Sequence, residues 1–411
     1  MNMTTDKNVA FFVGQFPKLS ETFIINQVTG LIDQGFDVTI FANHRPKENI
    51  QNDLVKEYDL YNRTNYVKSP TSYIEGANLL LKNIVKLARY YPGHIKELTS
   101  IVSRGKDLPI YVSNLLYFLE YNESFDICHA HFGPAGKNWS FIGDMADQGP
   151  FFVTFYGYDV SRLVHPNNYD YYNDLWSSCD QAIGITNHIK TKMILLGCPE
   201  EISLKHPIGI DTDKFSFSPL DYKSELKVTT IARFVEKKGI KYAIDAVADC
   251  VDKGINIQYR IAGDGPLRSE IEDQIQARNL GDNVKLLGWQ SQHEISSLLK
   301  NTHISLQPSV TATNGDMEGQ ALVLQEAQAM GVPIISTYHN GIPEGVLENK
   351  SGKLVSERDS QSIMSAIQYF VENPEQIHQY GKNGREFIES EFDNKTIISK
   401  QKDIYFEAMR K

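Results

Sequence analysis

Short apolar runs alternate along the chain with longer amphipathic segments. In the first half, a helix-like segment at 22–35 follows the first of the runs, which lie at 9–14, 37–42, 126–132, 150–156 and 181–186. A second series then begins, with runs at 226–233, 257–263, 284–289, 304–309 and 333–338. Runs of this length between helical segments are typical of βαβ units, in which helices cover both faces of a parallel sheet. The pattern predicts an α/β protein with two doubly wound, Rossmann-like domains.

Residues 206–223 separate the two series and contain two prolines and little periodicity. A length of 411 residues accommodates two or three domains. We predict a first domain at 1–215 and a second at 216–411, with the last helix a candidate to cross back onto the first domain. Ligands of open α/β sheets bind beyond the carboxyl ends of the strands, so two facing domains predict a site in the cleft between them.

Composition narrows the functional classes. The net charge of −10 argues against a general nucleic-acid binder, which would carry a basic footprint. The four cysteines, Cys128, Cys179, Cys198 and Cys250, form no C-x-x-C motif, which indicates a reducing compartment. The N-terminal residues lack the apolar core of a signal peptide, and no apolar run is long enough for a membrane span. We therefore expect a cytoplasmic protein.

Two cations follow the first strand of the second series. Arg233 ends that run, and Lys238 comes five residues later. Together they suit a diphosphate, with the arginine as a fork and the lysine as a point charge, although two solvated surface charges are the simpler interpretation. The next strand is followed by "GDGP" (263–266), whose glycines permit close approach of a ligand. This is not a dinucleotide fingerprint, because residue 268 is Arg.

A polar loop at 310–320 leads into a helical run at 321–331. The backbone N–H groups near Gln320, Ala321, Leu322 and Val323 would be unsatisfied at this helix start and would attract an anion. Two carboxylates, Glu318 and Glu326, lie ahead of the helix and on its second turn. The position of such a carboxylate has two interpretations. It can interact favourably with the helix dipole, or it can accept hydrogen bonds from sugar hydroxyls.

These segments resemble a known family. "ARFVEKKG", "GDGPL", "VKLLGW", "PSVTATNGDMEGQALVLQEAQAMGVPII" and "GIPEGV" occur in the order and spacing of the family-4 retaining nucleotide-sugar glycosyltransferases, which have the two-domain GT-B fold. Residues 16–42, "FDICHAHF" and "FYGYDVS" are similar to the subgroup that builds exopolysaccharides of the colanic acid and amylovoran type. The resemblance spans most of the chain and is least specific over residues 45–120.

The resemblance implies a role for each matching residue. It assigns the donor diphosphate to Arg233 and Lys238 with the N–H groups of Ala321, Leu322 and Val323, and the ribose to Glu326. Glu318 would face the transferred sugar. The surroundings of the ribose and base match Gly265 and Trp289. The donor-sugar loop matches Gly315, Asp316, Gly319 and Gln320. The helix-start loop after "HNG" matches Pro343 and Glu344.

One position departs from the family pattern. The family reads F-H-G-x-D after the fourth strand, whereas this chain has Tyr156 in place of the histidine and keeps Asp159. A tyrosine can hydrogen-bond a hydroxyl or phosphate but is a poorer proton shuttle at neutral pH. In retaining transfer the departing diphosphate can take the acceptor proton, so residue 156 would orient the substrate. The catalytic candidates are Glu318, Tyr156 and Asp159.

We expect no metal and no cofactor beyond the donor. His129 and His131 share a strand face, but without a third ligand they are more simply packed or cleft-lining residues. Asp211 and Asp213 imitate a D-x-D metal motif within the linker, and we interpret them as structural.

Residues 79–106 carry six cations among apolar residues: Lys82, Lys86, Arg89, Lys96, Arg104 and Lys106. Such a segment can lie on an anionic membrane, or it can be an ordinary packed helix with a solvated face.

The leading hypothesis is a retaining, metal-independent hexosyltransferase that uses a nucleoside-diphosphate sugar, such as a UDP-sugar, and a lipid-linked saccharide. It would act in bacterial surface or exopolysaccharide synthesis at the inner face of the plasma membrane. The alternatives are a transferase of the same fold that makes a small glycoside, and a non-catalytic sugar-nucleotide-binding or assembly protein.

Overall fold

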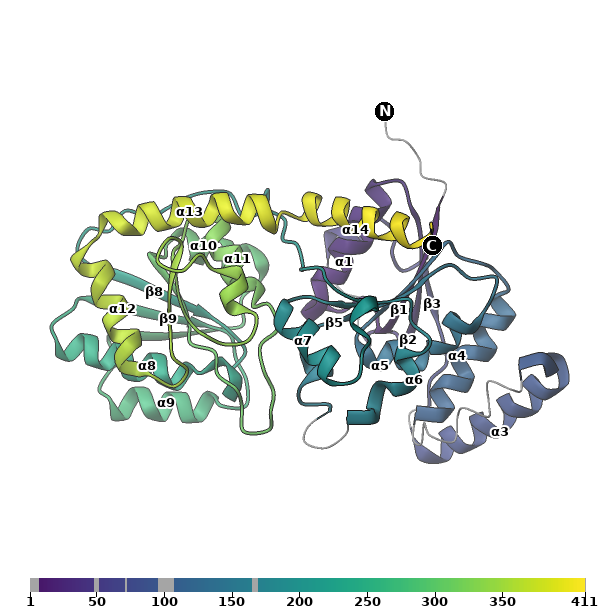
Figure 1. Ribbon diagram of the computed structural model, residues 1–411. Helices are drawn as coiled ribbons and strands as arrows, with labels where there is room; N and C mark the ends of the chain where they lie inside the picture. Colours follow the sequence, from purple (N-terminus) through teal and green to yellow (C-terminus); the bar gives the residue numbers. More distant parts are fainter. Residues whose placement is uncertain (1–6, 48–51, 71, 95–106, 165–168, 411) are drawn as a thin grey trace.

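The computed structural model describes residues 7–47, 52–70, 72–94, 107–164 and 169–410. They form two parallel sheets, each with helices on both faces (Figure 1). The predicted α/β class with two Rossmann-like domains is confirmed. No helix in the described ranges is long and apolar enough to cross a bilayer.

The first sheet has the strand order β3-β2-β1-β4-β5-β6-β7. Its strands are β1 Asn8–Gln15, β2 Asp37–His44, β3 Thr64–Tyr66, β4 Ile127–His131, β5 Phe151–Phe155, β6 Gln181–Gly184 and β7 Ser203–Lys205. The helices that accompany it are α1 Thr22–Asp33, α2 Asp53–Glu57, α3 Tyr73–Tyr90, α4 Leu108–Tyr121, α5 Gly133–Asn138, α6 Asn173–Trp176 and α7 Asn187–Leu195. The order reverses between β1 and β4, which is where open sheets form a binding crevice.

The second sheet has the order β10-β9-β8-β11-β12-β13 and reverses between β8 and β11. Its strands are β8 Leu226–Ile231, β9 Ile257–Ala262, β10 Val284–Gly288, β11 Ile304–Gln307, β12 Ile334–Thr337 and β13 Gly352–Val355. The helices that follow are α8 Ile240–Asp252, α9 Arg268–Ala277, α10 Gln292–Lys300, α11 Leu322–Ala329, α12 Ser360–Glu372, α13 Glu375–Glu391 and α14 Asn394–Ala408.

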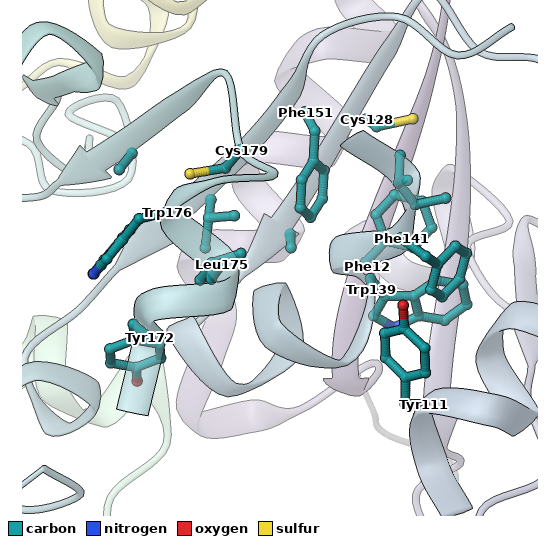
Figure 2. Packing of buried hydrophobic residues seen from close by; sticks show 14 of the residues in the cluster. Phe12, Tyr111, Cys128, Trp139, Phe141, Phe151, Tyr172, Leu175, Trp176 and Cys179 are labelled. Carbon is teal, nitrogen blue, oxygen red and sulfur yellow. The ribbon is translucent and has the colours of Figure 1, made fainter. Parts of the chain in front are cut away.

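Every predicted apolar run is a strand, and the three unpredicted strands lie near or at sheet edges. Central strands such as β4 and β5 are buried along their whole length, because helices cover both sheet faces. Beneath β1, Phe12 packs on Trp139 with ring centroids 4.5 Å apart, and Phe141 lies beside them (Figure 2). By contrast, β3, β7 and β13 have only three or four residues each and few apolar side chains.

The chain returns to the first domain at its end. The last two helices, α13 and α14, run along one side of both sheets (Figure 1), and α14 packs against α1. A side chain at Gly30 of α1 would place its Cβ 2.8 Å from Cγ1 of Ile398, so this mid-helix glycine provides room for α14. Tyr405 of α14 is fully buried, and its hydroxyl lies 2.5 Å from Nδ1 of His129.

The segment between the sheets, residues 206–225, contains no helix or strand. Arg385 of α13 holds it in place. Its guanidinium donates to the carbonyl oxygens of Thr212 at 3.3 Å and Phe215 at 2.7 Å, and to that of Ala329 in α11 at 2.8 Å. The predicted domain boundary at 215/216 falls within this segment and stays a prediction.

We predict that Arg385→Met lowers the free energy of unfolding by about 2–3 kcal/mol, because three carbonyl oxygens lose a charged donor. Arg278→Met is the matched control, since Arg278 makes one exposed ion pair to Asp245 at 2.6 Å and its loss should cost less than about 1 kcal/mol. Urea unfolding followed by circular dichroism measures both. Equal effects of the two substitutions would contradict the role given to Arg385.

Candidate active site

A cleft of about 430 Å³ lies at the carboxyl ends of β8, β9 and β10. The first domain contributes Ser20 to its lining, so it lies between the domains. The cleft brings together seven residues predicted from sequence: Arg233, Lys238, Trp289, Glu318, Ala321, Leu322 and Val323. With Lys237, which also lines it, the cleft combines three cations, a carboxylate and a helix start at one sheet edge.

The two cations differ in their surroundings. Arg233 is exposed in the loop after β8, and its guanidinium forms no hydrogen bond or ion pair with the residues described. Lys238 ends a 3-10 turn, Glu236–Lys238, and its ammonium group pairs with the Glu318 carboxylate. Both partners of that pair are mostly buried, with side chains 15% and 14% exposed. Arg233 is thus available to a ligand, whereas Lys238 is already paired.

The start of α11 lacks a side-chain cap. Its N-cap residue, Ala321, adopts a left-handed conformation with φ 56° and ψ 61° and has no polar side chain to bond the first turn. Leu322 and Val323 line the cleft and begin a helix without a side-chain cap, which is the arrangement that attracts an anion.

Glu318 and Glu326 have opposite electrostatic environments. Burial by itself would raise the pKa of Glu318, but the ammonium groups of Lys238 and Lys237 hold that pKa at about 2. Glu326 is partly exposed on α11, has no bonded partner among the described residues, and burial raises its pKa to about 7. Near neutral pH one carboxylate is permanently ionised and the other is half protonated.

Much of the loop 315–320 is engaged with protein. The Asp316 carboxylate lies 3.1 Å from Lys237 Nζ. Gln320 is buried, and its amide donates to the carbonyl of Ile208 at 2.7 Å and accepts from the N–H of Ile208 at 2.8 Å. These side chains hold the loop to its neighbours. The expectation that Asp316 and Gln320 lie at the donor sugar stays a prediction.

The glycines of the site permit close approach of backbones. A Cβ at Gly319 would lie 2.2 Å from the carbonyl oxygen of Tyr156 in the first domain, and one at Gly265 would lie 2.6 Å from that of Phe234. Gly315 has φ 77° and its N–H donates to the carbonyl of Ala312 at 2.9 Å, which closes a turn. Of the predicted surroundings of the base, Trp289 lines the cleft and is 68% exposed, whereas Gly265 is not one of its lining residues.

Tyr156 and Asp159 lie outside the cleft lining. The Tyr156 hydroxyl lies 2.6 Å from Nδ1 of His131, and burial raises the pKa of Tyr156 well above its ordinary value, so the hydroxyl stays neutral. The fully buried Asp159 carboxylate accepts the N–H groups of Tyr156 at 3.0 Å, Gly157 at 2.8 Å and Gly133 at 3.2 Å. Burial raises the pKa of Asp159, although these bonds oppose the rise. Asp159 thus holds the turn after β5, an arrangement the sequence does not reveal.

The histidine pair of β4 is packed. His129 binds the Thr154 hydroxyl at 2.7 Å, and its ring stacks on that of His131 with centroids 4.5 Å apart. Burial lowers the pKa of His129 well below its ordinary value and that of His131 to about 3, so both rings are neutral. The described ranges contain no group of three or more His, Cys, Asp or Glu arranged for a metal. In the linker, Asp211 accepts the N–H of Asp213 at 3.2 Å, and Asp213 pairs with Lys395 at 2.7 Å, so both aspartates are structural.

The domains also meet beside the cleft through Glu344. This residue lies in the 3-10 helix Ile342–Gly345, and its carboxylate accepts the N–H groups of Asn187 at 3.0 Å and His188 at 3.2 Å. Lys205 Nζ lies 3.2 Å from the same carboxylate. Glu344 therefore occupies the start of α7 in the opposite domain, which favours negative charge.

Sequence reasoning misses His339, which supports Glu318. The ring is fully buried; its Nε2 accepts the N–H of Glu318 at 3.0 Å, and its Nδ1 lies 2.5 Å from the Glu357 carboxylate. Because Nε2 is an acceptor, the proton is on Nδ1. Glu357 in turn accepts the N–H of Thr311 at 2.9 Å. The His-Asn-Gly turn could have drawn attention to His339, but no local signal links it to Glu357.

Comparisons with known proteins identify the class of protein to which this chain belongs. Residues 211–387 match the family model described as "Glycosyl transferases group 1". The amylovoran biosynthesis glycosyltransferase AmsK of Erwinia amylovora is 31% identical over 402 residues, which cover 94% of this chain and 96% of that protein. WcaL of Escherichia coli, a glycosyltransferase assigned to colanic acid biosynthesis, is 31% identical over 398 residues, covering 95% and 97% of the two chains.

Solved structures show the same fold at low identity. Anabaena Alr3699/HepE in complex with UDP superimposes with a TM-score of 0.72 at 17% identity, covering 98% of this chain and all of that one. Sucrose-phosphate synthase from Thermosynechococcus elongatus has a TM-score of 0.72 at 18% identity, with 98% of each chain covered. The molecule is a glycosyltransferase of the GT-B fold. It belongs to the group 1 glycosyltransferase family and is related to the transferases of exopolysaccharide biosynthesis.

We predict that His339→Ala speeds amide exchange at Glu318 at least tenfold, because the N–H loses its acceptor. His339→Gln is the matched variant, since its Oε1 can accept in place of Nε2 and should retain most of the protection. Hydrogen–deuterium exchange of a peptide covering 315–320, followed by mass spectrometry, measures both. Unchanged exchange in His339→Ala would show that other contacts hold the loop.

Proposed function

We propose that the protein is a retaining, metal-independent hexosyltransferase. Its donor is a nucleoside-diphosphate hexose, with UDP-sugars as the first candidates, and its acceptor is a lipid-linked saccharide of surface or exopolysaccharide synthesis at the cytoplasmic face of the plasma membrane. The observation that carries the proposal is the cleft, where an unpaired arginine and an uncapped helix start lie beside the ionised carboxylate of Glu318.

The donor diphosphate would lie between Arg233 and the start of α11. The guanidinium can bind two phosphate oxygens at once, and the N–H groups of Leu322 and Val323 can bind another. Lys238 would exchange part of its contact with Glu318 for phosphate. Arg233, Lys238 and the helix N-terminus supply positive potential to the diphosphate, and in this proposal they take the place of a divalent ion.

The nucleoside would extend from the diphosphate toward Glu326 and Trp289. The Glu326 carboxylate is unpartnered within the described structure and can accept two ribose hydroxyls. The exposed Trp289 ring offers a surface on which a base can stack.

The chemistry follows from the ionisation of the groups present. The acceptor hydroxyl attacks the anomeric carbon on the face that the diphosphate leaves; the bond from carbon to diphosphate oxygen breaks, and the hydroxyl proton passes to that oxygen. Glu318, ionised at any physiological pH, stabilises the positive charge that develops on the sugar ring. The neutral Tyr156 hydroxyl and the buried Asp159 shape the first-domain side of the site.

Transfer to a lipid extract from labelled nucleoside-diphosphate hexoses, in excess chelator, tests this function. We expect labelled glycolipid with the donor's anomeric configuration. Arg233→Met should weaken donor affinity roughly 10–100-fold by removing charged hydrogen bonds, whereas Arg278→Met should not. Restoration by manganese after loss in chelator would refute metal independence, and an inverted product would refute retention. Equal donor affinity of both arginine variants and the unmodified protein would refute the site.

Donor affinity should rise with pH through the titration of Glu326. Ribose hydroxyls bond to the ionised carboxylate, and at pH 6 a group with a pKa of about 7 is mostly protonated. A nucleotide sugar has no phosphate ionisation in this range, so the affinity of the unmodified protein should increase about tenfold between pH 6 and pH 8. In Glu326→Gln the increase should be absent. Calorimetric titration with UDP-sugars measures both; an equal pH dependence of the two proteins would assign the titration to another group.

A further inference from the structure

The helix α3 exposes an apolar stripe to solvent. Ile74, Leu81 and Val85 are 78%, 67% and 61% exposed and recur at the spacing of one helix face. Tyr73 and Tyr90, at the two ends of the helix, are 88% and 60% exposed. In Figure 1 this helix lies at the outer edge of the first domain, on the side away from the second.

Packing of the fold does not explain this stripe. The opposite face of α3 is the one that contacts α4, through the buried residues Gly76, Asn83 and Leu87. Asn83 donates to the hydroxyl of Ser113 at 3.0 Å, and Gly76 lies against Pro109. The helix therefore has apolar side chains on both faces: Leu80, Ile84 and Leu87 pack inward, while Ile74, Leu81 and Val85 point outward. Monomeric proteins seldom leave such a contiguous apolar surface without a partner.

Positive charge flanks the stripe on one side. Lys82 and Arg89 are exposed and form no ion pair with the residues described, whereas Lys86 pairs with Glu120 of α4. The sequence predicts a basic amphipathic segment at 79–106, whereas the helix observed here spans 73–90 and ends before Pro92. The other three cations predicted for it, Lys96, Arg104 and Lys106, lie outside the described residues.

We propose that the outward face of α3 docks on a lipid bilayer that carries acidic headgroups. The helix lies in the plane of the interface, with Ile74, Leu81 and Val85 at the acyl boundary and Lys82 and Arg89 at the phosphates. A second copy meeting this face would bring like charges together, whereas an anionic bilayer complements both the apolar stripe and the cations. The docking involves no residue of the cleft, so it goes beyond the proposed transfer reaction and does not depend on it.

Vesicle flotation without donor tests the proposal. We expect the protein to float with vesicles of equal parts phosphatidylcholine and phosphatidylglycerol, to float less at high salt, and to stay unbound with phosphatidylcholine alone. Each cation near an anionic bilayer raises partitioning about fivefold, so the double variant Lys82→Glu/Arg89→Glu should lower it at least about twentyfold. Leu81→Ser/Val85→Ser should lower it as strongly while net charge is unchanged.

The matched control is Lys285→Glu/Lys300→Glu, which makes the same charge change on exposed residues of the second domain and should leave flotation unchanged. Equal loss in this control would show general electrostatic attraction, and failure of the unmodified protein to float would remove the docking surface altogether. Sedimentation completes the test, because a dimer abolished by Leu81→Ser/Val85→Ser would identify a second copy as the occupant and overturn the proposal. Donor affinity should be equal in all these variants, so a negative result leaves the cleft chemistry intact.

Discussion

The ion pair between Lys238 and Glu318 determines the electrostatics of the whole cleft. It joins the loop after β8 to the loop before α11, and it keeps a mostly buried carboxylate ionised that would otherwise take up a proton. A buried pair of this kind is costly to break by removing one partner, because the other charge is left uncompensated. An incoming anion avoids that cost, since the ammonium group can bind a phosphate oxygen while staying near the carboxylate. The Glu318 carboxylate therefore has its counter-charge before a ligand arrives.

The two sides of the cleft are held together by contacts that leave the two domains little room to move relative to each other. At Gly319 and Tyr156 the backbones of the two domains meet so closely that a methyl group would not fit. Glu344 adds a charged contact at the start of α7. Any movement that widens the cleft has to separate these contacts together, which couples the position of the Glu318 loop to that of the turn after β5.

The strands could be predicted because central parallel strands are apolar on both faces, and this leaves a continuous signal in the sequence. The short strands β3, β7 and β13 could not, since three or four residues with mixed polarity carry no period. Resemblance and post-strand position together located Arg233, Lys238 and the start of α11. The partnership of His339 with Glu357 escaped prediction because it joins residues brought together only by the sheet. The hydrogen bonds of Gln320 to Ile208 escaped for the same reason.

The path of the last two helices constrains the order in which the molecule can be completed during synthesis. Residues 394–408 cover α1 of the first domain, and Tyr405 closes a buried network with His129. When the ribosome has synthesised every strand of the first sheet, it has not yet synthesised α14, the helix that covers α1. Until then the surface around Gly30, Phe36 and Phe152 lacks its cover, and the nascent first domain must wait for almost two hundred further residues (206–393) to be made. Although it is first in sequence, the N-terminal domain is the later of the two to be finished.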